Sequence, residues 1–250
     1  MRVALHVEMQ KLVRSLVGTT TSFTMVLGTV FLLAGITAGV RAGQEELIAQ
    51  AGPAGAATWD GLLLAAAQVT SAGALLGAGV LVSWLLAREF SDGTVSALFA
   101  LPVGLGRIAA AKLLVLGLWA PTLGLTLGAA VLTLGLVLGY GAPDHETWAA
   151  LCRQVILVPL SALLAMPAAW VATLGRSLLA GVGTTVGLLV VAQVGALTGA
   201  GPWIPFAAPA LWAMTGGAEV SAVQLSLSVV TGLVFAALTA AAWSRLQLDR

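Results

Sequence analysis

The longest charged interruption between the apolar segments of this chain reads Arg88-Glu89-Phe90-Ser91-Asp92-Gly93-Thr94-Val95-Ser96-Ala97-Leu98-Phe99-Ala100-Leu101-Pro102. Only 8% of all residues are charged, yet this stretch and the ten residues after it hold five charges. Because a charge is costly in hydrocarbon, we expect all five to face water or a partner in water. They are Arg88, Glu89, Asp92, Arg107 and Lys112.

The middle of this stretch has the pattern of a short surface helix. The turn-forming residues Asp92-Gly93-Thr94 are expected to cap it, and Pro102 is expected to end it. Between them, apolar residues recur at helical spacing. We therefore predict a short amphipathic helix across the membrane surface, with its apolar positions at Val95, Leu98, Phe99 and Leu101.

The composition is that of an integral membrane protein. The chain has 250 residues, 59% of them hydrophobic, and a mean hydropathy of +1.02, whereas soluble domains carry about 25% charged residues. The net charge is +1, and the basic residues are scattered. This argues against nucleic acid as a partner, since phosphate binding requires a basic patch. Membrane lipid is the expected surrounding.

Six apolar segments are long enough to cross about 30 Å of hydrocarbon at about 1.5 Å per residue. The fourth is irregular, because Arg153 lies in its first turns and Pro159 and Pro167 interrupt it. The chain is thus predicted to be a single all-α transmembrane domain over residues 1–250. The expected spans are about 18–40, 62–87, 112–139, 148–174, 178–197 and 221–243.

Two further segments are expected to lie at the membrane surface. Residues 1–17 mix basic and apolar residues, which favours an interfacial elbow helix over a secretory signal, because no cleavage site ends the apolar stretch. Residues 198–220 are apolar but rich in Gly, Pro and Trp. They are predicted to form either a short broken or re-entrant helical element or a plain interfacial loop, and the sequence leaves both open.

The basic residues predict the orientation of the spans. A cytoplasmic N-terminus puts nine of the eleven Lys and Arg residues inside and only Arg41 and Arg153 outside, in agreement with the positive-inside rule. We therefore expect a multi-pass protein of the cell membrane with both termini in the cytoplasm. The nine are Arg2, Lys11, Arg14, Arg88, Arg107, Lys112, Arg176, Arg245 and Arg250.

The charged stretch resembles the loop between the second and third spans of ABC-2 type transporter permeases, which has the form R-E-x-x-x-G-T-x-x-x-L-x-x-x-P-x-x-x-x-R-x-x-x-x-K. In that family the loop, which corresponds to residues 88–107 here, carries a coupling helix that docks on a separate ATPase. The resemblance implies that Arg88 and Glu89 hold the start of this helix, and that Gly93 and Thr94 form its first turn. The matching positions are Arg88, Glu89, Gly93, Thr94, Leu98, Pro102, Arg107 and Lys112.

The resemblance also implies partners. The chain has no G-x-x-x-x-G-K-[ST] loop, so ATP and Mg²⁺ would bind a cytoplasmic ATPase subunit, and this chain would bind no cofactor and catalyse no reaction. A second copy or a homologous permease would complete the pathway. Two alternatives remain: an ATP-independent carrier or channel, and a membrane scaffold. The sequence does not select a cargo.

A few polar and small residues inside the spans are secondary candidates. Gln68, Gln154 and Gln193 either line a pathway or bond to a neighbouring helix, which we favour. Arg153 is read as an interface anchor rather than a substrate contact. Gly73 and Gly77 form a G-x-x-x-G pair, which favours helix packing within the subunit over a dimer interface. The two histidines lie far apart, so we expect no metal site.

Overall fold

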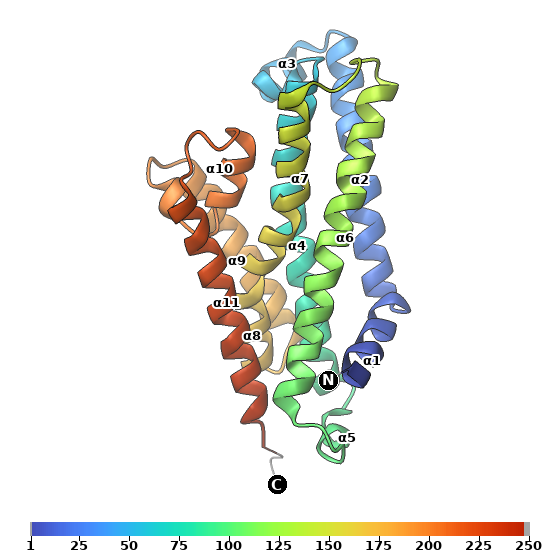
Figure 1. Cartoon of the computed structure of the whole chain (residues 1–250), viewed down its shortest axis with the longest axis vertical. Helices are drawn as coiled ribbons and strands as arrows, with labels where there is room; N and C mark the ends of the chain where they lie inside the picture. Colours follow the sequence, from blue (N-terminus) through green and yellow to red (C-terminus); the bar gives the residue numbers. More distant parts are fainter. Residues whose placement is uncertain (1, 248–250) are drawn as a thin grey trace.

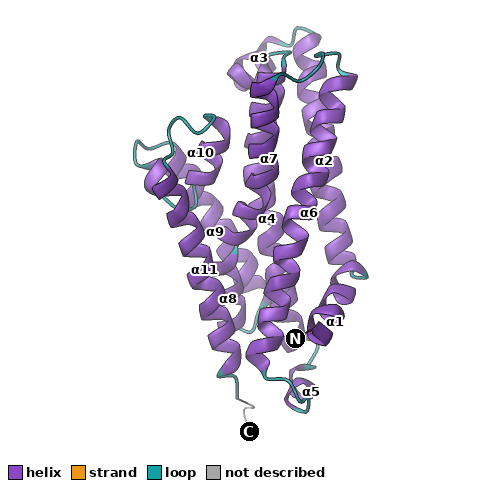
Figure 2. Cartoon of the chain, viewed as in Figure 1, coloured by secondary structure: helices purple, strands orange, loops and turns teal. Residues whose placement is uncertain are grey.

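A computed structural model describes residues 2–247, and every regular element within this range is a helix (Figures 1 and 2). Arg250, one of the basic residues used to orient the chain, lies outside the described residues. Six helical units are long and apolar enough to cross a membrane, which confirms the predicted number of spans. They are α2 (Leu16–Arg41), α4 (Trp59–Ser91), α6 (Leu105–Val137), α7 (His145–Leu164) with α8 (Met166–Leu174), α9 (Leu178–Ala196) and α11 (Ala222–Ser244).

Polar side chains mark where most of these helices begin. At five of the six starts, a side-chain oxygen accepts a hydrogen bond from a backbone N–H in the first turn. Such bonds satisfy donors that have no partner inside the helix. The sequence therefore encodes these starts locally, through Ser15, Thr58, Asp144, Ser177 and Ser221.

Two spans extend beyond the predicted limits. α4 and α6 each have 33 residues, or about 50 Å at about 1.5 Å per residue, which exceeds the ~30 Å hydrocarbon thickness. α6 begins at Leu105, seven residues before the expected start at Lys112. Arg88, Arg107 and Lys112 thus lie on the spanning helices, and only residues 92–104 form the connection between them.

The fourth span is broken at Ala165, which separates α7 from α8. Pro167 is in the first turn of α8, where it lacks an N–H and its ring would clash with the carbonyl four residues earlier. Pro167 thus accounts for the break, whereas Pro159, which was also expected to interrupt this segment, lies inside α7 without ending it.

α4 is the central helix of the bundle. It packs against α2, α6, α7, α8 and α9. Of its most apolar window 56% is buried, against 61% for the fourth span and 17% for α9 and for α11. Small buried residues such as Ala66, Ala78 and Ala87 allow neighbours to approach it closely. At Gly79, a Cβ atom would collide with Thr185 of α9, so glycine is required for this crossing.

The predicted G-x-x-x-G pair also lies on α4. A Cβ atom at Gly73 or Gly77 would lie 3.2–3.4 Å from atoms of α2, mainly those of Met25. Both positions therefore face a neighbouring helix of the same chain.

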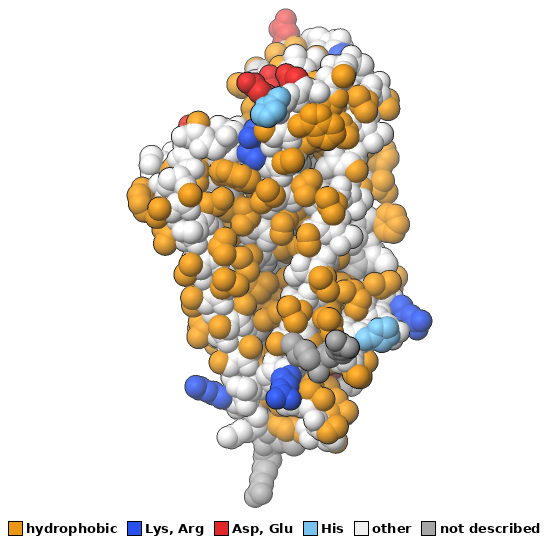
Figure 3. All heavy atoms as spheres, viewed as in Figure 1, with side chains coloured by type: hydrophobic (Ala, Val, Ile, Leu, Met, Phe, Trp, Pro, Cys, Tyr) orange, Lys and Arg blue, Asp and Glu red, His pale blue; other side chains and the backbone are white. Residues whose placement is uncertain are grey.

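The remaining elements lie at the two ends of the bundle. α1 (Arg2–Val13) and α5 (Val95–Phe99) are at the end where α11 finishes, which we call the α5 end (Figure 1). α3 (Glu45–Ala51) and η1 (Gly52–Gly55) lie at the opposite end, where acidic side chains gather on the face drawn in Figure 3. Residues 198–220 form the short helices η2 (Gly201–Trp203) and α10 (Ala208–Met214), so of the two forms that the sequence left open the structure has short helical elements.

Candidate functional site

Two of the five charges expected to face water are buried inside the protein. Lys112 is 0% exposed and Glu89 is 4% exposed, so the expectation that all five face water or a partner is wrong for this pair. The reason is the length of α4 and α6, which carry both residues as packed helix rather than as loop. α1 lies alongside α6 at this end and contributes the partners of the two charges.

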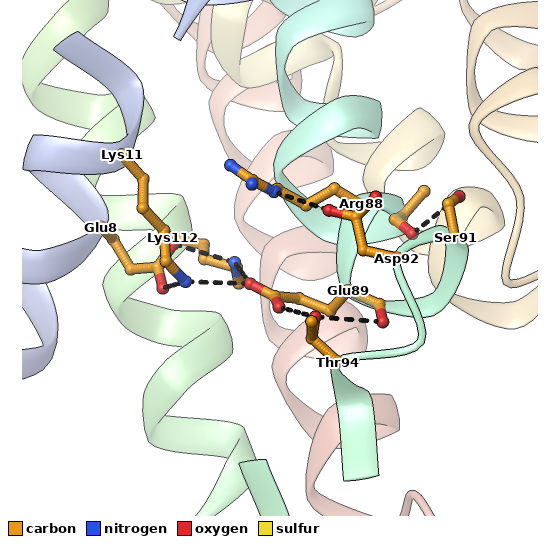
Figure 4. A network of polar contacts seen from close by, with 9 residues as sticks. Glu8, Lys11, Arg88, Glu89, Ser91, Asp92, Thr94 and Lys112 are labelled. Carbon is orange, nitrogen blue, oxygen red and sulfur yellow. Dashed lines mark hydrogen bonds and ion pairs between the residues drawn. The ribbon is translucent and has the colours of Figure 1, made fainter. Parts of the chain in front are cut away.

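Four charged side chains form a closed ring of ion pairs at the α5 end (Figure 4). The Lys112 Nζ atom lies 2.8 Å from Glu8 Oε2 and 2.9 Å from Glu89 Oε1. The Lys11 Nζ atom lies 2.8 Å from Glu8 Oε1 and 3.0 Å from Glu89 Oε1. We call these four residues the ion quartet. It joins α1, α4 and α6, and its two positive and two negative charges alternate.

The quartet satisfies charges that burial would otherwise destabilise. A buried ion is stable only when it is paired and hydrogen-bonded, and each lysine here donates to both carboxylates. Burial lowers the pKa of Lys11, but hydrogen bonds from its ammonium to Glu8 and Glu89 outweigh this effect, and its pKa is raised from the ordinary 10.5. Removing one member would leave an uncompensated buried charge.

The loop before α5 is attached to the quartet through Thr94. Its Oγ1 donates a 2.6 Å hydrogen bond to Glu89 Oε2, the oxygen that does not contact the lysines. Gly93, with φ of 67°, makes the turn that brings the chain back to α4. The cap expected for the short helix is absent: Thr94 occupies the N-cap position of α5 without a capping hydrogen bond. Asp92 caps the C-terminal end of α4 instead, and its exposed carboxylate lies 3.6 Å from the half-buried Arg88 guanidinium.

α5 presents apolar side chains at the surface. It covers Val95–Phe99 and is shorter than the predicted helix, which ran to Leu101. Leu98 packs against the core, while Phe99 is 37% exposed and Leu101 is 50% exposed. Pro102 and Arg107 are exposed as well. One side of the loop is thus attached to the bundle. The other side presents the apolar side chains of Phe99 and Leu101, which the rest of the described chain leaves exposed.

A fourth helix packs against the quartet. Trp243 of α11 is fully buried. The centroid of its ring lies 5.9 Å from the Lys112 Nζ atom and 5.7 Å from the centroid of the Phe90 ring. Its indole Nε1 donates to Thr173 Oγ1 at 3.1 Å. The site therefore connects α1, α4, α6, α8 and α11.

Glu8 and Trp243 were not among the candidates from sequence. Glu8 is the only acidic residue before Glu45 and lies one helical turn before Lys11, a spacing that indicates an ion pair on one helix but not its burial. Trp243 had no comparable signal, since tryptophan near the end of a span is common at membrane interfaces.

The three glutamines do not form one site. Gln154 is buried and donates a 2.6 Å hydrogen bond from Nε2 to Thr70 Oγ1 on α4, the interhelical role favoured from sequence. Gln68 and Gln193 are exposed. Arg153 is half-buried and lines a cavity at the end opposite α5. Among residues 2–247, no group of three or more His, Cys, Asp and Glu residues could hold a metal ion.

A comparison of the chain with protein families identifies one family that matches most of its length. The model for the ABC-2 family transporter protein matches residues 4–192 of the 250. The chain belongs to this family. The matched part of this ABC-2 permease includes the whole ion quartet and α5, and it ends within α9, before α10 and α11. No curated protein and no solved structure gives a significant match.

The family and the six spans make this chain a multi-pass membrane protein and a transporter permease. ABC-2 permeases are transmembrane subunits and are generally non-catalytic.

Proposed function

We propose that this ABC-2 permease is the membrane subunit of an ATP-driven exporter, and that energy enters it through residues 92–104. A separate cytoplasmic ATPase binds ATP and Mg²⁺ and receives α5. Two copies of the chain, or one copy and a homologous permease, enclose the pathway. The protein crosses the cell membrane six times with both termini in the cytoplasm.

The attachment of the α5 loop to the ion quartet is the observation that carries this proposal. Thr94 of the loop bonds to Glu89, and Glu89 pairs with lysines on two other helices. A displacement of the loop therefore acts on α1, α4 and α6 together. This suits a coupling element, which has to move several spans as a rigid body.

The lengths of α4 and α6 support the same function. Both helices flank the loop and continue for about 50 Å, so a shift at the α5 end reaches the opposite end of the bundle. The exposed Phe99 and Leu101 supply an apolar surface for the ATPase. A few side chains that become fully buried on binding commonly carry most of the affinity of an interface.

The docking surface is tested by the double variant Phe99→Ser, Leu101→Ser. The permease is co-expressed with the Walker-motif ATPase encoded next to it, and co-purification, thermal stability and ATP-dependent transport in vesicles are measured. We expect unchanged stability, because both side chains are exposed, and a loss of ATPase binding of at least about tenfold, equivalent to about 1.4 kcal/mol. The matched control Leu174→Ser changes an exposed leucine outside the α5 loop.

Normal ATPase binding and normal transport by the double variant would contradict the proposal. Transport by the wild-type permease in liposomes without any ATPase would instead identify an ATP-independent carrier. Glu89→Ala is unsuitable for this test, because it would unbalance the buried quartet. Gly93→Val is a better second variant, since a β-branched residue at φ of 67° strains the turn while the quartet remains intact.

A further inference from the structure

A polar cavity lies at the end of the bundle opposite α5, between α4, α7 and α10. Its volume is about 200 Å³. Asp60 begins one wall, as the second residue of α4, and Arg153 and Gln154 of α7 form another. Met214 closes it on the side of α10, and Gly216 follows in the loop. The α10 side lies beyond the residues that the family model matches.

Two polar groups in this cavity wall have no partner. Gln154 is 2% exposed, and its Oε1 atom is buried without a hydrogen bond from any described residue. The Nε atom of the neighbouring Arg153 is in the same condition. Buried polar groups in native proteins are nearly always hydrogen-bonded. Two unpaired groups on adjacent residues, one acceptor and one donor, therefore indicate a polar ligand.

The cavity also carries one charge of each sign. Asp60 and Arg153 both line it, yet no ion pair joins them or involves either residue elsewhere in the described part of the chain. Gly216 has φ of 67°, and a Cβ atom there would lie 3.7 Å from the Arg153 Nη2 atom. The loop thus passes close to the guanidinium without a side chain that would cover it.

We propose that this cavity binds a zwitterionic group that consists of an oxyanion and a primary ammonium. The Arg153 guanidinium donates hydrogen bonds to the oxyanion, for which its planar geometry is suited. The ammonium donates to Gln154 Oε1 and lies near the Asp60 carboxylate. Pockets for drug-sized ligands have about 300–1,000 Å³, so a cavity of about 200 Å³ fits a group the size of phosphoethanolamine.

This group has two sources, a phosphatidylethanolamine lipid or a free soluble zwitterion. Binding at this cavity requires no ATPase, so the proposal is independent of the proposed function. The purified full chain in detergent is titrated by calorimetry with dihexanoyl phosphatidylethanolamine, with dihexanoyl phosphatidylcholine and with phosphoethanolamine. The choline head group keeps the phosphate and the positive charge but has no N–H to donate.

We expect the ethanolamine lipid to bind at least about tenfold more tightly than the choline lipid, because only the former satisfies Gln154 Oε1. Binding of phosphoethanolamine with equal affinity would identify the soluble source, and binding of the lipid alone would identify the lipid source; both support the proposal. Equal binding of the two lipids, or binding of none of the three probes, would overturn it.

Three variants separate the site from general effects on the fold. Arg153→Gln should weaken binding at least about tenfold, while the control Arg41→Gln, an arginine at the same end but outside the cavity, should bind normally. Gln154→Met should reduce the preference for ethanolamine over choline to about one. This readout is a ratio, so it does not depend on how much of the variant folds. An unchanged preference would contradict the role of Gln154.

Discussion

The two ends of this bundle use polar side chains in opposite ways. At the α5 end, four charges pair with one another, and each lysine contacts both carboxylates within 3.0 Å. At the opposite end, Asp60 and Arg153 share a cavity without pairing, and Gln154 Oε1 has no donor. A site whose charges are mutually satisfied holds helices together, whereas a site with unsatisfied groups is available to a ligand.

The substitution Lys112→Met is the strongest test of the difference between the two ends. The change leaves Glu8 and Glu89 buried with only Lys11 between them, and removing one partner of a buried pair costs about 3–5 kcal/mol of unfolding free energy. We expect a loss in this range in the thermal or denaturant unfolding of the purified protein. The control is Arg107→Gln, which removes an exposed positive charge five residues earlier on the same helix, and should change stability by less than about 0.5 kcal/mol. Equal effects of both variants would mean that the quartet is not a structural unit.

A double-mutant cycle measures whether the charges of the quartet stabilise one another. Glu89→Gln with Lys112→Met removes one charge of each sign and leaves the Glu8–Lys11 pair, at 2.8 Å, intact. We expect the double variant to be more stable than the sum of the two single losses predicts, by about 0.5–3 kcal/mol. The measurement is the unfolding free energy of all four proteins under one condition. Additive losses would show that the four charges act independently.

The smallest expected effect is at the other end. Arg153→Gln removes a charge that has no ion pair, so the unfolding free energy should change by less than about 0.5 kcal/mol. Arg41→Gln should cost more, because the Arg41 guanidinium donates a 2.7 Å hydrogen bond to the Leu138 carbonyl and lies over Tyr140. If Arg153→Gln were the more destabilising of the two, the distinction between the two ends would fail.

Local sequence patterns predicted most of the fold. Hydropathy located the six spans, and residues such as Ser15 and Ser177 mark helix starts through bonds within their own first turn. The break near Pro167 could also be predicted from the sequence, because a proline disrupts the helical turn before it. These features depend on residues close together in the chain.

The site was predicted less well, because it depends on distant contacts. The motif located Glu89, Thr94 and Lys112, but treating the charges as solvent-exposed missed their burial. The partner Glu8 lies 104 residues from Lys112, and no local pattern joins them. The docking of α5, the second permease copy and the orientation in the cell membrane stay predictions.

The separation between Glu8 and Lys112 also sets an order of events while the protein is made. At about 5–20 residues per second, the first helix emerges several seconds before the lysine that it binds. During that interval Glu8 has only Lys11, one turn away on its own helix, as a charged partner from the quartet. The contact between Glu8 and Lys112 can form only once the start of the third span exists, so the first helix is not joined to α6 until more than a third of the chain has been made.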